Sequence, residues 1–571
     1  MRRAVSCLPF SQLLEQSRPL TLVTLIFKFV SYLKISNKII EWGIIFLIVF
    51  TPIAFGTVNP WAYTLMELTI CFLIIIWIIR LAIINLKKRS ANKYRASSIE
   101  NLESSLIIPE SLNPSIPQSS LVNRFGFIKT PLNIPIILFI GLILFQLVPL
   151  PPGVLKLISP NTYQLYKTTS PGWPVNEAPN PSITQSLNSS IPQSSIVNPK
   201  SQISSWRSLT IYRHATKGEL YKILAYIGMF FLIVNYNPST RSRKPVTTEH
   251  RLKIKRFIIC LVIGFVVIGC FESIYGLLEC LSGHEHIFFR KKVRAGLDFV
   301  TGTYINRNHF AGYMAIVICM CFGYLTYISS GFIKTNISGW RQKLSQIINL
   351  VGNKSGLIFF LLLIMSSALV LSGSRMGICC FIVSIMFMSL IISKKMSIRK
   401  ISLILIPVCL MTMWIGLSSV SDRFSQLTVT VEGAADQGRI QVWEDSRSLI
   451  KDFPVFGTGL GTFEYAFPKY KTFKRRVLYD HAHNDYVELI SDTGFAGFII
   501  VITGAVYYLI MVTRLYFRRR DPFVRGITIG CLGGILYITL HSLTDFNLQI
   551  PANALHLSMI TGIMHKTVTQ L

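Results

Sequence analysis

Long apolar runs alternate with short polar stretches along most of the 571-residue chain. A run of about 20 mainly apolar residues is long enough to cross the hydrocarbon core of a bilayer as a helix. Twelve such runs lie near residues 39–56, 62–86, 131–150, 219–236, 256–278, 309–329, 355–372, 376–393, 401–418, 487–513, 525–543 and 551–567. The pattern predicts an all-α polytopic membrane protein of about twelve transmembrane helices, with a large periplasmic loop between helices 9 and 10.

Lys and Arg gather in the short connections "LKKRSANKYR", "RSRKPVTTEHRLKIKR", "SKKMSIRK" and "RLYFRRRDPFVR". Short loops crowded with basic residues favour the cytoplasmic side of a membrane. This asymmetry predicts a cytoplasmic N-terminus. It also predicts that the segments around 151–218, 279–308 and 419–486 face the outer, non-cytoplasmic side.

The same alternation divides the chain into six parts. These are a cytoplasmic N-terminal segment (1–38), helices 1–3 with a disordered cytoplasmic loop at 87–130 (39–150), a periplasmic Ser/Pro-rich loop (151–218), helices 4–9 (219–418), the large periplasmic loop (419–486), and helices 10–12 with a short cytoplasmic tail (487–571). Two near copies, "SLNPSIPQSSLVN" and "SLNSSIPQSSIVN", have the composition of disordered linkers.

Composition narrows the class further. Hydrophobic residues make up 51% of the chain and charged residues 15%, which lies outside the range of soluble domains. The net charge of +31 comes from clusters dispersed between apolar runs, so we expect no nucleic-acid partner. The 11 cysteines form no CxxC pair and are interpreted as packing residues.

The segment "DHAHNDYVELISDTGFAG" concentrates polar residues where the large loop turns into the tenth predicted helix. Its polar residues are His481, His483, Asn484, Asp485 and Glu488. A helix N-terminus favours an anion and keeps an imidazole neutral, as a general base must be. A helix cap flanked by solvated histidines fits the pattern equally well. Two HxH pairs, His481 with His483 and His284 with His286, raise the question of a metal, but nothing completes a zinc spacing, so no metal and no cofactor are predicted.

Two arginines are candidates for binding an anion on the same side. Arg375 lies in the tight turn "LSGSRMG", where an unpaired guanidinium at membrane depth is costly and therefore suggests function. Arg439 begins the amphipathic segment "GRIQVWEDS". A guanidinium pairs well with phosphate oxygens, so the two could clamp a pyrophosphate. The alternative for Arg375 is an interfacial side chain that reaches the lipid headgroups.

Further polar residues stand at the outer ends of predicted helices. The segment "GTYINRNHFAGYM" supplies amides and aromatic rings suited to sugars, and also fits an ordinary polar cap with an interfacial aromatic belt. Asp545, in "SLTDFNLQIPANAL", is a nearby acid. The predicted substrate-binding residues are Tyr304, Asn306, Arg307, Asn308, His309, His481, Asn484, Glu488 and Asp545.

The spacing His483-Asn484, nine residues, Gly494, two residues, Gly497 resembles the signature of the O-antigen ligase family. The resemblance extends, in the family's order, through "GTYINRNHFAGY", "LSGSRMG", "GRIQVWEDS", "FPVFGTGLGTFEYAFPKY" and "SLTDFNLQIPANAL", and covers roughly residues 300–555. Upstream, "LVPLPPGVLKLISP" is similar as well.

This resemblance implies a membrane glycosyltransferase that needs no metal. It would move a glycan, with inversion, from a polyprenyl-pyrophosphate carrier to a lipid-core or other acceptor hydroxyl at the periplasmic face. His483 would act as the general base, while Arg375 and Arg439 would offset the charge of the departing pyrophosphate. His481 is a second candidate base.

Related activities remain open at this point. A polysaccharide polymerase would join two lipid-linked repeats, and a protein O-oligosaccharyltransferase would use a protein hydroxyl. Acids within predicted helices, such as Glu272 and Glu279, are also typical of a transporter or flippase, which would be expected to contain inverted repeats.

Overall fold

The computed structural model describes residues 10–100, 128, 130–170, 173–174, 206–238, 248–283, 285–292, 299–330, 354–393, 431–473 and 478–571. The predicted span 401–418, both near-copy segments and His284 lie outside these ranges. Within them the protein is mostly helical, as the hydrophobic pattern predicts.

Eight helices among the described residues are long and apolar enough to cross a membrane. They are residues Pro60–Asn85 of α2 (Pro60–Glu100), then α7 (Arg213–Asn235), α8 (Thr248–Leu281), α9 (Arg307–Ser329), α11 (Lys354–Leu371), α12 (Arg375–Ser393), α16 (Asp485–Arg518) and α17 (Pro522–His541). This confirms a multi-pass membrane protein. The predicted number of twelve spans stays a prediction, although α1 (Phe10–Ile53), the shorter α3 (Asn133–Leu147) and α18 (Pro551–Gln570) are helices at three of the other predicted positions.

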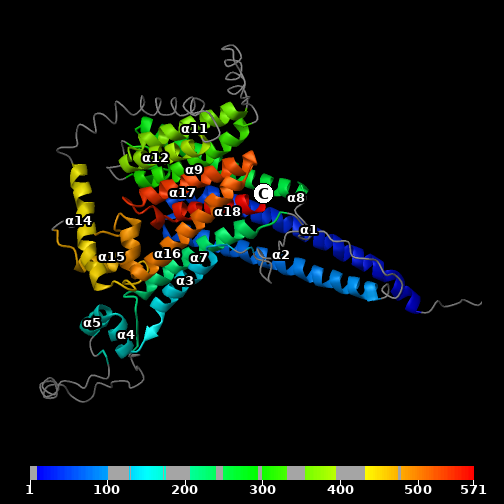
Figure 1. Cartoon of the computed structure of the whole chain (residues 1–571), viewed down its shortest axis with the longest axis horizontal. Coiled ribbons are helices and arrows are strands. Elements are labelled where there is room, and N and C mark those ends of the chain that lie inside the picture. Colours follow the sequence, from blue (N-terminus) through cyan, green and yellow to red (C-terminus); the bar gives the residue numbers. More distant parts are fainter. Residues whose placement is uncertain are drawn as a thin grey trace, which may run out of the picture.

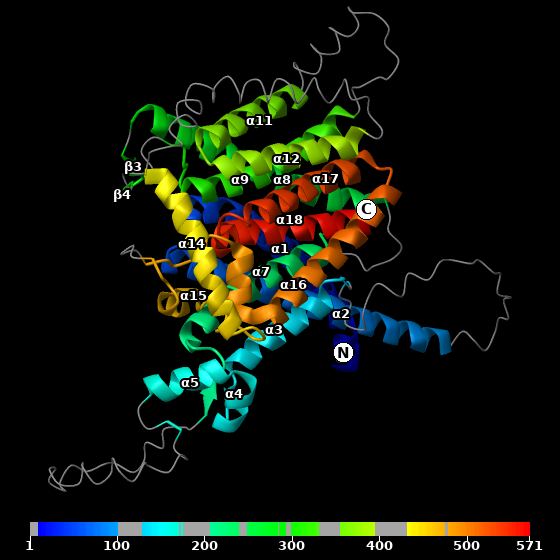
Figure 2. The same ribbon diagram turned by 60° about the vertical axis from the view of Figure 1, so that its left-hand side comes forward.

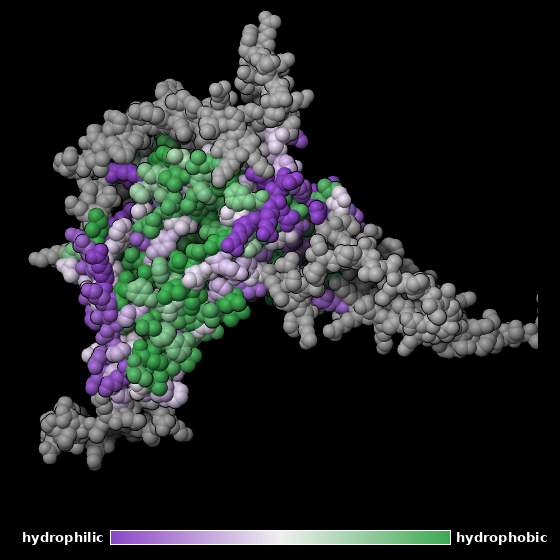
Figure 3. All heavy atoms as spheres, viewed as in Figure 1, coloured by the Kyte–Doolittle hydropathy of each residue, from purple (hydrophilic) through white to green (hydrophobic). Residues whose placement is uncertain are grey.

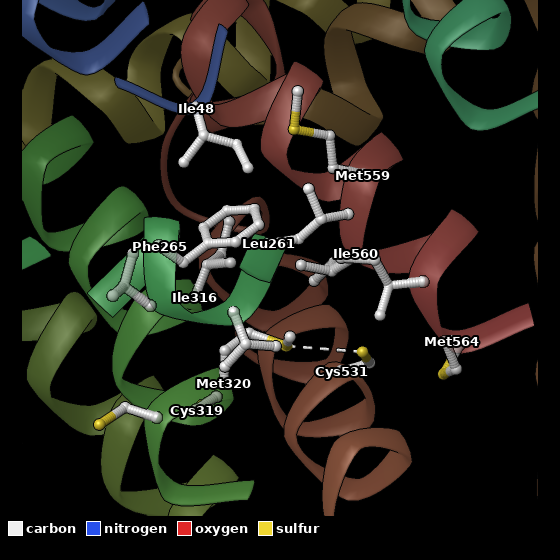
Figure 4. Close-up of a cluster of buried hydrophobic side chains, with 14 of the residues drawn as sticks. Ile48, Leu261, Phe265, Ile316, Cys319, Met320, Cys531, Met559, Ile560 and Met564 are labelled. Atoms are coloured by element: carbon white, nitrogen blue, oxygen red, sulfur yellow. Dashed lines mark hydrogen bonds between the residues drawn. The ribbon is translucent and has the colours of Figure 1, made fainter. Parts of the chain in front are cut away.

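Helices α9, α17 and α18 form the centre of the bundle, with the others around them (Figures 1 and 2). Glycines bring α9 and α17 into backbone contact, since a Cβ added to Gly323 would lie 2.4 Å from the carbonyl oxygen of Gly526. Small residues allow such close approach between membrane helices. Figure 4 shows the adjoining apolar core, where Phe265 of α8, Ile316 of α9 and Ile560 of α18 pack together.

The face shown in Figure 3 carries apolar residues over most of the bundle and hydrophilic residues along α14 (Val431–Asp452). Large apolar side chains exposed on the helices include Ile75, Val267, Phe360 and Ile499. A face of this kind suits lipid rather than water.

Smaller elements gather at the end of the bundle where α14 lies (Figures 1 and 2). They are η1 (Phe55–Thr57), α4 (Pro152–Ile158), α5 (Pro160–Thr169), α15 (Phe463–Ala466), η4 (Phe467–Lys469), η5 (Asn547–Gln549) and two hairpins, in which β1 (Pro149–Leu150) pairs with β2 (Arg207–Ser208) and β3 (His286–Ile287) with β4 (Arg290–Lys291), both antiparallel.

The two long segments predicted to share one side of the membrane do meet at this end. The amide of Asn161 donates to the carbonyl of Asp452 at 2.7 Å, and the backbone N–H of Ile211 donates to the carbonyl of Thr458 at 2.9 Å. The described parts of these predicted loops are ordered, because helices and short strands bury their backbone groups against each other.

Candidate functional site

A cavity of about 350 Å³ lies between α14 and the turns that precede α9, α12 and α18. Twelve residues line it: Arg307, Asn308, Gly373, Ser374, Arg375, Met376, Arg439, Ile440, Trp443, His541, Thr544 and Asp545. Three guanidinium groups therefore converge on one cavity from three separate helices.

Helix α14 supplies Arg439 and, one turn later, Trp443. The Trp443 indole N–H donates to the carbonyl of Ala482 at 2.9 Å, which ties α14 to the histidine motif. Arg439 donates from Nη1 to the carbonyl of Thr544 at 3.2 Å, and its Nη2 lies 3.8 Å from Asp545 Oδ2. The amphipathic segment is thus an element of the cavity wall.

Arg375 and Arg307 occupy the first positions of α12 and α9. The turn before Arg375 passes through Gly373, whose φ of +63° is one that glycine adopts without strain. Phe299 packs against this glycine, and the Arg307 guanidinium lies 3.7 Å above the centre of the Phe299 ring. This cation–π contact fixes Arg307 at the edge of the cavity.

Asp545 is the buried acid at the centre of the site. One of its carboxylate oxygens lies 3.7 Å from His309 Nε2 and 3.5 Å from His483 Nδ1. These contacts are longer than ordinary hydrogen bonds. Burial favours a neutral carboxyl, but the two imidazoles and the charge of Arg439 outweigh it and hold the pKa of Asp545 well below its usual range.

His483 adopts a left-handed backbone conformation with a φ of 52°, which is strained for a residue other than glycine. Its neighbours on both sides impose this conformation. Ala482 donates its N–H to Glu488, while the side chain of Asn484 caps α16 by accepting from Tyr486 and Val487. The strain keeps the imidazole beside Asp545 instead of in a relaxed turn.

His481 belongs to a second imidazole–carboxylate pair. Its Nδ1 lies 2.8 Å from Glu488 Oε1, and its ring stacks on Phe546 at 4.5 Å. Burial disfavours the imidazolium, yet the neighbouring carboxylate of Glu488 prevails and raises the pKa of His481 to about 9. A cation at neutral pH is a poor base, which makes His481 a poor candidate for the general base.

Close packing explains why the signature has a glycine at position 494. Gly494 interrupts α16 with φ +64° and ψ −174°, and a Cβ there would lie 2.2 Å from the carbonyl oxygen of Val455. The loop before α15 therefore packs backbone against backbone on the kink. The side-chain amide of Gln146 in α3 connects the loop and the kinked helix by donating to the carbonyls of Phe456 and Asp492. The kink separates the short first part of α16, which directly follows the histidine motif, from the long apolar part.

The other predicted residues are divided between the cavity and its supports. Arg307, Asn308, Arg375, Arg439 and Asp545 line the cavity, and His309, His481 and His483 surround Phe546 beside it. Asn306 and Asn484 cap α9 and α16. Tyr304 is buried in the bundle, where its hydroxyl donates to Asn553 Oδ1 at 3.3 Å, away from the cavity lining.

Sequence reasoning missed three polar residues of the lining, namely His541, Ser374 and Thr544. His541 ends α17 four positions before Asp545. The signal available in the sequence was the position of His541 just before the acid Asp545, at a helix end facing the predicted outer side. Within the described ranges, no three His, Cys, Asp or Glu side chains lie close enough to hold a metal ion.

Together the fold and the site define a class: a multi-pass helical membrane protein with an arginine-lined cavity beside a pair formed by an imidazole and a carboxylate. Residues 360–502 match the family described as O-Antigen ligase, which supports the resemblance seen in the sequence over this part of the chain. The match includes Arg375, Arg439, His481 and His483. No curated protein matches the chain.

Proposed function

We propose that the protein transfers a glycan from a polyprenyl-pyrophosphate carrier to an acceptor hydroxyl at the periplasmic face of the bacterial inner membrane. The observation that carries this proposal is the convergence of Arg307, Arg375 and Arg439 on one cavity beside His483 and Asp545. Guanidinium groups are matched to phosphate oxygens, and an imidazole held by a carboxylate is suited to proton abstraction.

His483 is the general base in this proposal. With its proton on Nδ1, on the side of Asp545, the ring has an unprotonated Nε2 that can accept a proton. It takes the proton of the acceptor hydroxyl as that oxygen bonds to the anomeric carbon. The bond from this carbon to the pyrophosphate oxygen breaks, and the leaving group keeps the electron pair. Displacement from the opposite side inverts the anomeric configuration.

The arginines stabilise the leaving group. Negative charge grows on the pyrophosphate as its bond to the glycan breaks, and cations that are already in position stabilise that charge without reorganising. Arg307 is held by its ring contact and Arg439 by the carbonyl of Thr544, so both are fixed before substrate arrives. This chemistry needs no metal, and metal independence is part of the proposal.

The test is transfer of a lipid-linked glycan to an acceptor in proteoliposomes containing the full chain. We expect transfer to persist in EDTA and to be lost in His483→Asn. Asn is chosen because it tolerates a left-handed backbone better than Ala does. Transfer that stops in EDTA and returns on adding zinc would contradict metal independence. Transfer by His483→Asn at the wild-type rate would contradict the assignment of His483 as the general base.

Acceptor trials in the same proteoliposomes decide among the related activities. A ligase uses a lipid-core acceptor, a polymerase uses a second lipid-linked repeat, and a protein O-oligosaccharyltransferase uses a serine or threonine hydroxyl. We propose the ligase activity on the basis of the family match to residues 360–502.

A further inference from the structure

A chain of buried polar side chains runs from the bundle centre to the cavity, and its first member has a fixed orientation. Asn553 Nδ2 lies 3.0 Å from the backbone carbonyl oxygen of His309. A backbone carbonyl can only accept, so this atom of Asn553 must be the amide nitrogen. The opposite atom, Oδ1, accepts from the Tyr304 hydroxyl at 3.3 Å, which agrees with that assignment.

The orientation of Asn553 determines that of Asn547 in η5. Asn553 Nδ2 also lies 3.2 Å from one side-chain atom of Asn547, which must therefore be the oxygen. The remaining atom of Asn547 is then its amide nitrogen, and it lies 3.1 Å from His541 Nδ1. Both asparagines are fully buried, and a Cβ on Gly312 would lie 2.1 Å from Asn547 Oδ1, so the packing leaves little freedom.

Asn547 in turn selects the tautomer of His541. Its amide is a donor, so Nδ1 of His541 has to accept and cannot carry a proton. The Tyr537 hydroxyl, 3.1 Å from the same nitrogen, can adapt to either state because a hydroxyl both donates and accepts. A neutral His541 ring therefore carries its proton on Nε2. Since His541 lines the cavity and Nδ1 faces the interior network, Nε2–H is the polar atom left for the cavity.

We propose that His541 is a further substrate-binding residue, which Asn547 holds as a neutral donor so that Nε2–H bonds a phosphate oxygen of the lipid-linked donor. The identity of that ligand rests on the proposed function. The cavity already receives guanidinium donors from three helices, and phosphate oxygens can accept from all of these groups. A neutral donor adds a directed hydrogen bond without adding charge next to Arg439.

The experiment uses the full chain in lipid nanodiscs, with farnesyl pyrophosphate as the probe and titration calorimetry as the measurement. His541→Gln and His541→Asn form a matched pair, because a Gln amide reaches the position of Nε2 and an Asn amide only that of Nδ1. A hydrogen bond to a charged group corresponds to about tenfold or more in affinity. We expect His541→Asn to bind about tenfold more weakly and His541→Gln to bind within about threefold of the wild type.

Tyr537→Phe is the control variant, since it removes the hydroxyl at Nδ1 and leaves the Asn547 donor in place. It should bind the probe as the wild type does. Solid-state NMR of ¹⁵N-histidine-labelled protein, with His541→Gln identifying the resonance, should show His541 protonated on Nε2. A proton on Nδ1 would overturn the proposal.

The outcomes separate this inference from the proposed function. If His541→Asn binds the probe as tightly as the wild type while Arg439→Gln does not, the pyrophosphate site stands and His541 has no part in it. If the wild type does not bind the probe, both ideas fail. If His541→Asn loses affinity and His541→Gln keeps it, both gain support.

Discussion

The two ends of α18 hold buried cations in contrasting ways. At its C-terminal end, Lys566 donates to the carbonyl of Tyr236 at 2.5 Å, and the nearby Arg80 donates to the carbonyl of Asn237 at 2.6 Å. At its N-terminal end, Arg439 reaches Asp545 only at 3.8 Å and shares the cavity wall with Arg307 and Arg375. The helix, about 30 Å long at 1.5 Å per residue, separates the two regions.

We interpret this difference as one between cations that stabilise the fold and cations that bind a ligand. Lys566 and Arg80 end at backbone carbonyls of the α7 terminus and the residues that follow it, so they join helices and leave no surface for a ligand. The cavity arginines come from three helices and line one shared cavity, as expected of groups that bind an anion. Changes at the cavity should therefore affect transfer, and changes at Lys566 should affect stability.

The largest effect is expected at His483. Replacing it with Asn should lower the turnover number by about 10²- to 10⁴-fold, the usual contribution of a general base, with little change in thermal unfolding. The measurement is initial-rate transfer together with a melting curve in the same lipid. If His483→Asn transferred glycan at a rate within tenfold of the wild type, His483 would not be the general base. The two ends of α18 would then no longer differ in this chemical role.

Arg439→Gln is expected to lower kcat/KM for the lipid-linked donor by about 10- to 100-fold, since it removes a charge-assisted contact to phosphate. Lys451→Gln is the matched control, because Lys451 lies on the same helix and is exposed away from the cavity lining. Equal losses in both variants would mean that α14 acts through its general positive charge.

Lys566→Met should have the opposite profile. It leaves the backbone carbonyl of Tyr236 without its buried donor, at a cost of about 1–3 kcal/mol, and should lower the melting temperature by a few degrees. The KM for the donor should not change. A variant that melts normally but binds the donor weakly would show that the two ends of α18 are coupled.

The smallest effect concerns the pair His481 and Glu488. The folded pKa of His481, about 9, lies above its ordinary value of about 6.5, so the pair stabilises the fold fully below pH 6.5 and loses this effect as the pH rises through 9. His481 is partly exposed, which reduces the gain. At pH 6 the Glu488→Gln variant should therefore melt about 2 °C or less below the wild type. At pH 10 the two proteins should have the same melting temperature. A gap that widens with pH would contradict the assignment.

Much of the fold was predictable because long apolar runs have few alternatives to helix in lipid. Eight of the predicted spans meet length and hydropathy criteria for crossing a membrane. Helix α18 shows the limit of that reasoning. It carries buried Asn553 and Lys566, whose polar groups bond to α9 and to the C-terminal end of α7, and no count of apolar residues reveals which neighbours they contact.

The sequence by itself determined the helical membrane class and placed His483 and Arg375 in polar motifs at the ends of helices. These follow from local composition and from the N-terminal ends of helices. Only the tertiary structure decided that His483 faces Asp545, that His481 pairs with Glu488, and that His541 lines the cavity with its Nδ1 accepting from Asn547. Such pairings depend on distances between segments far apart in the chain, and packing sets those distances.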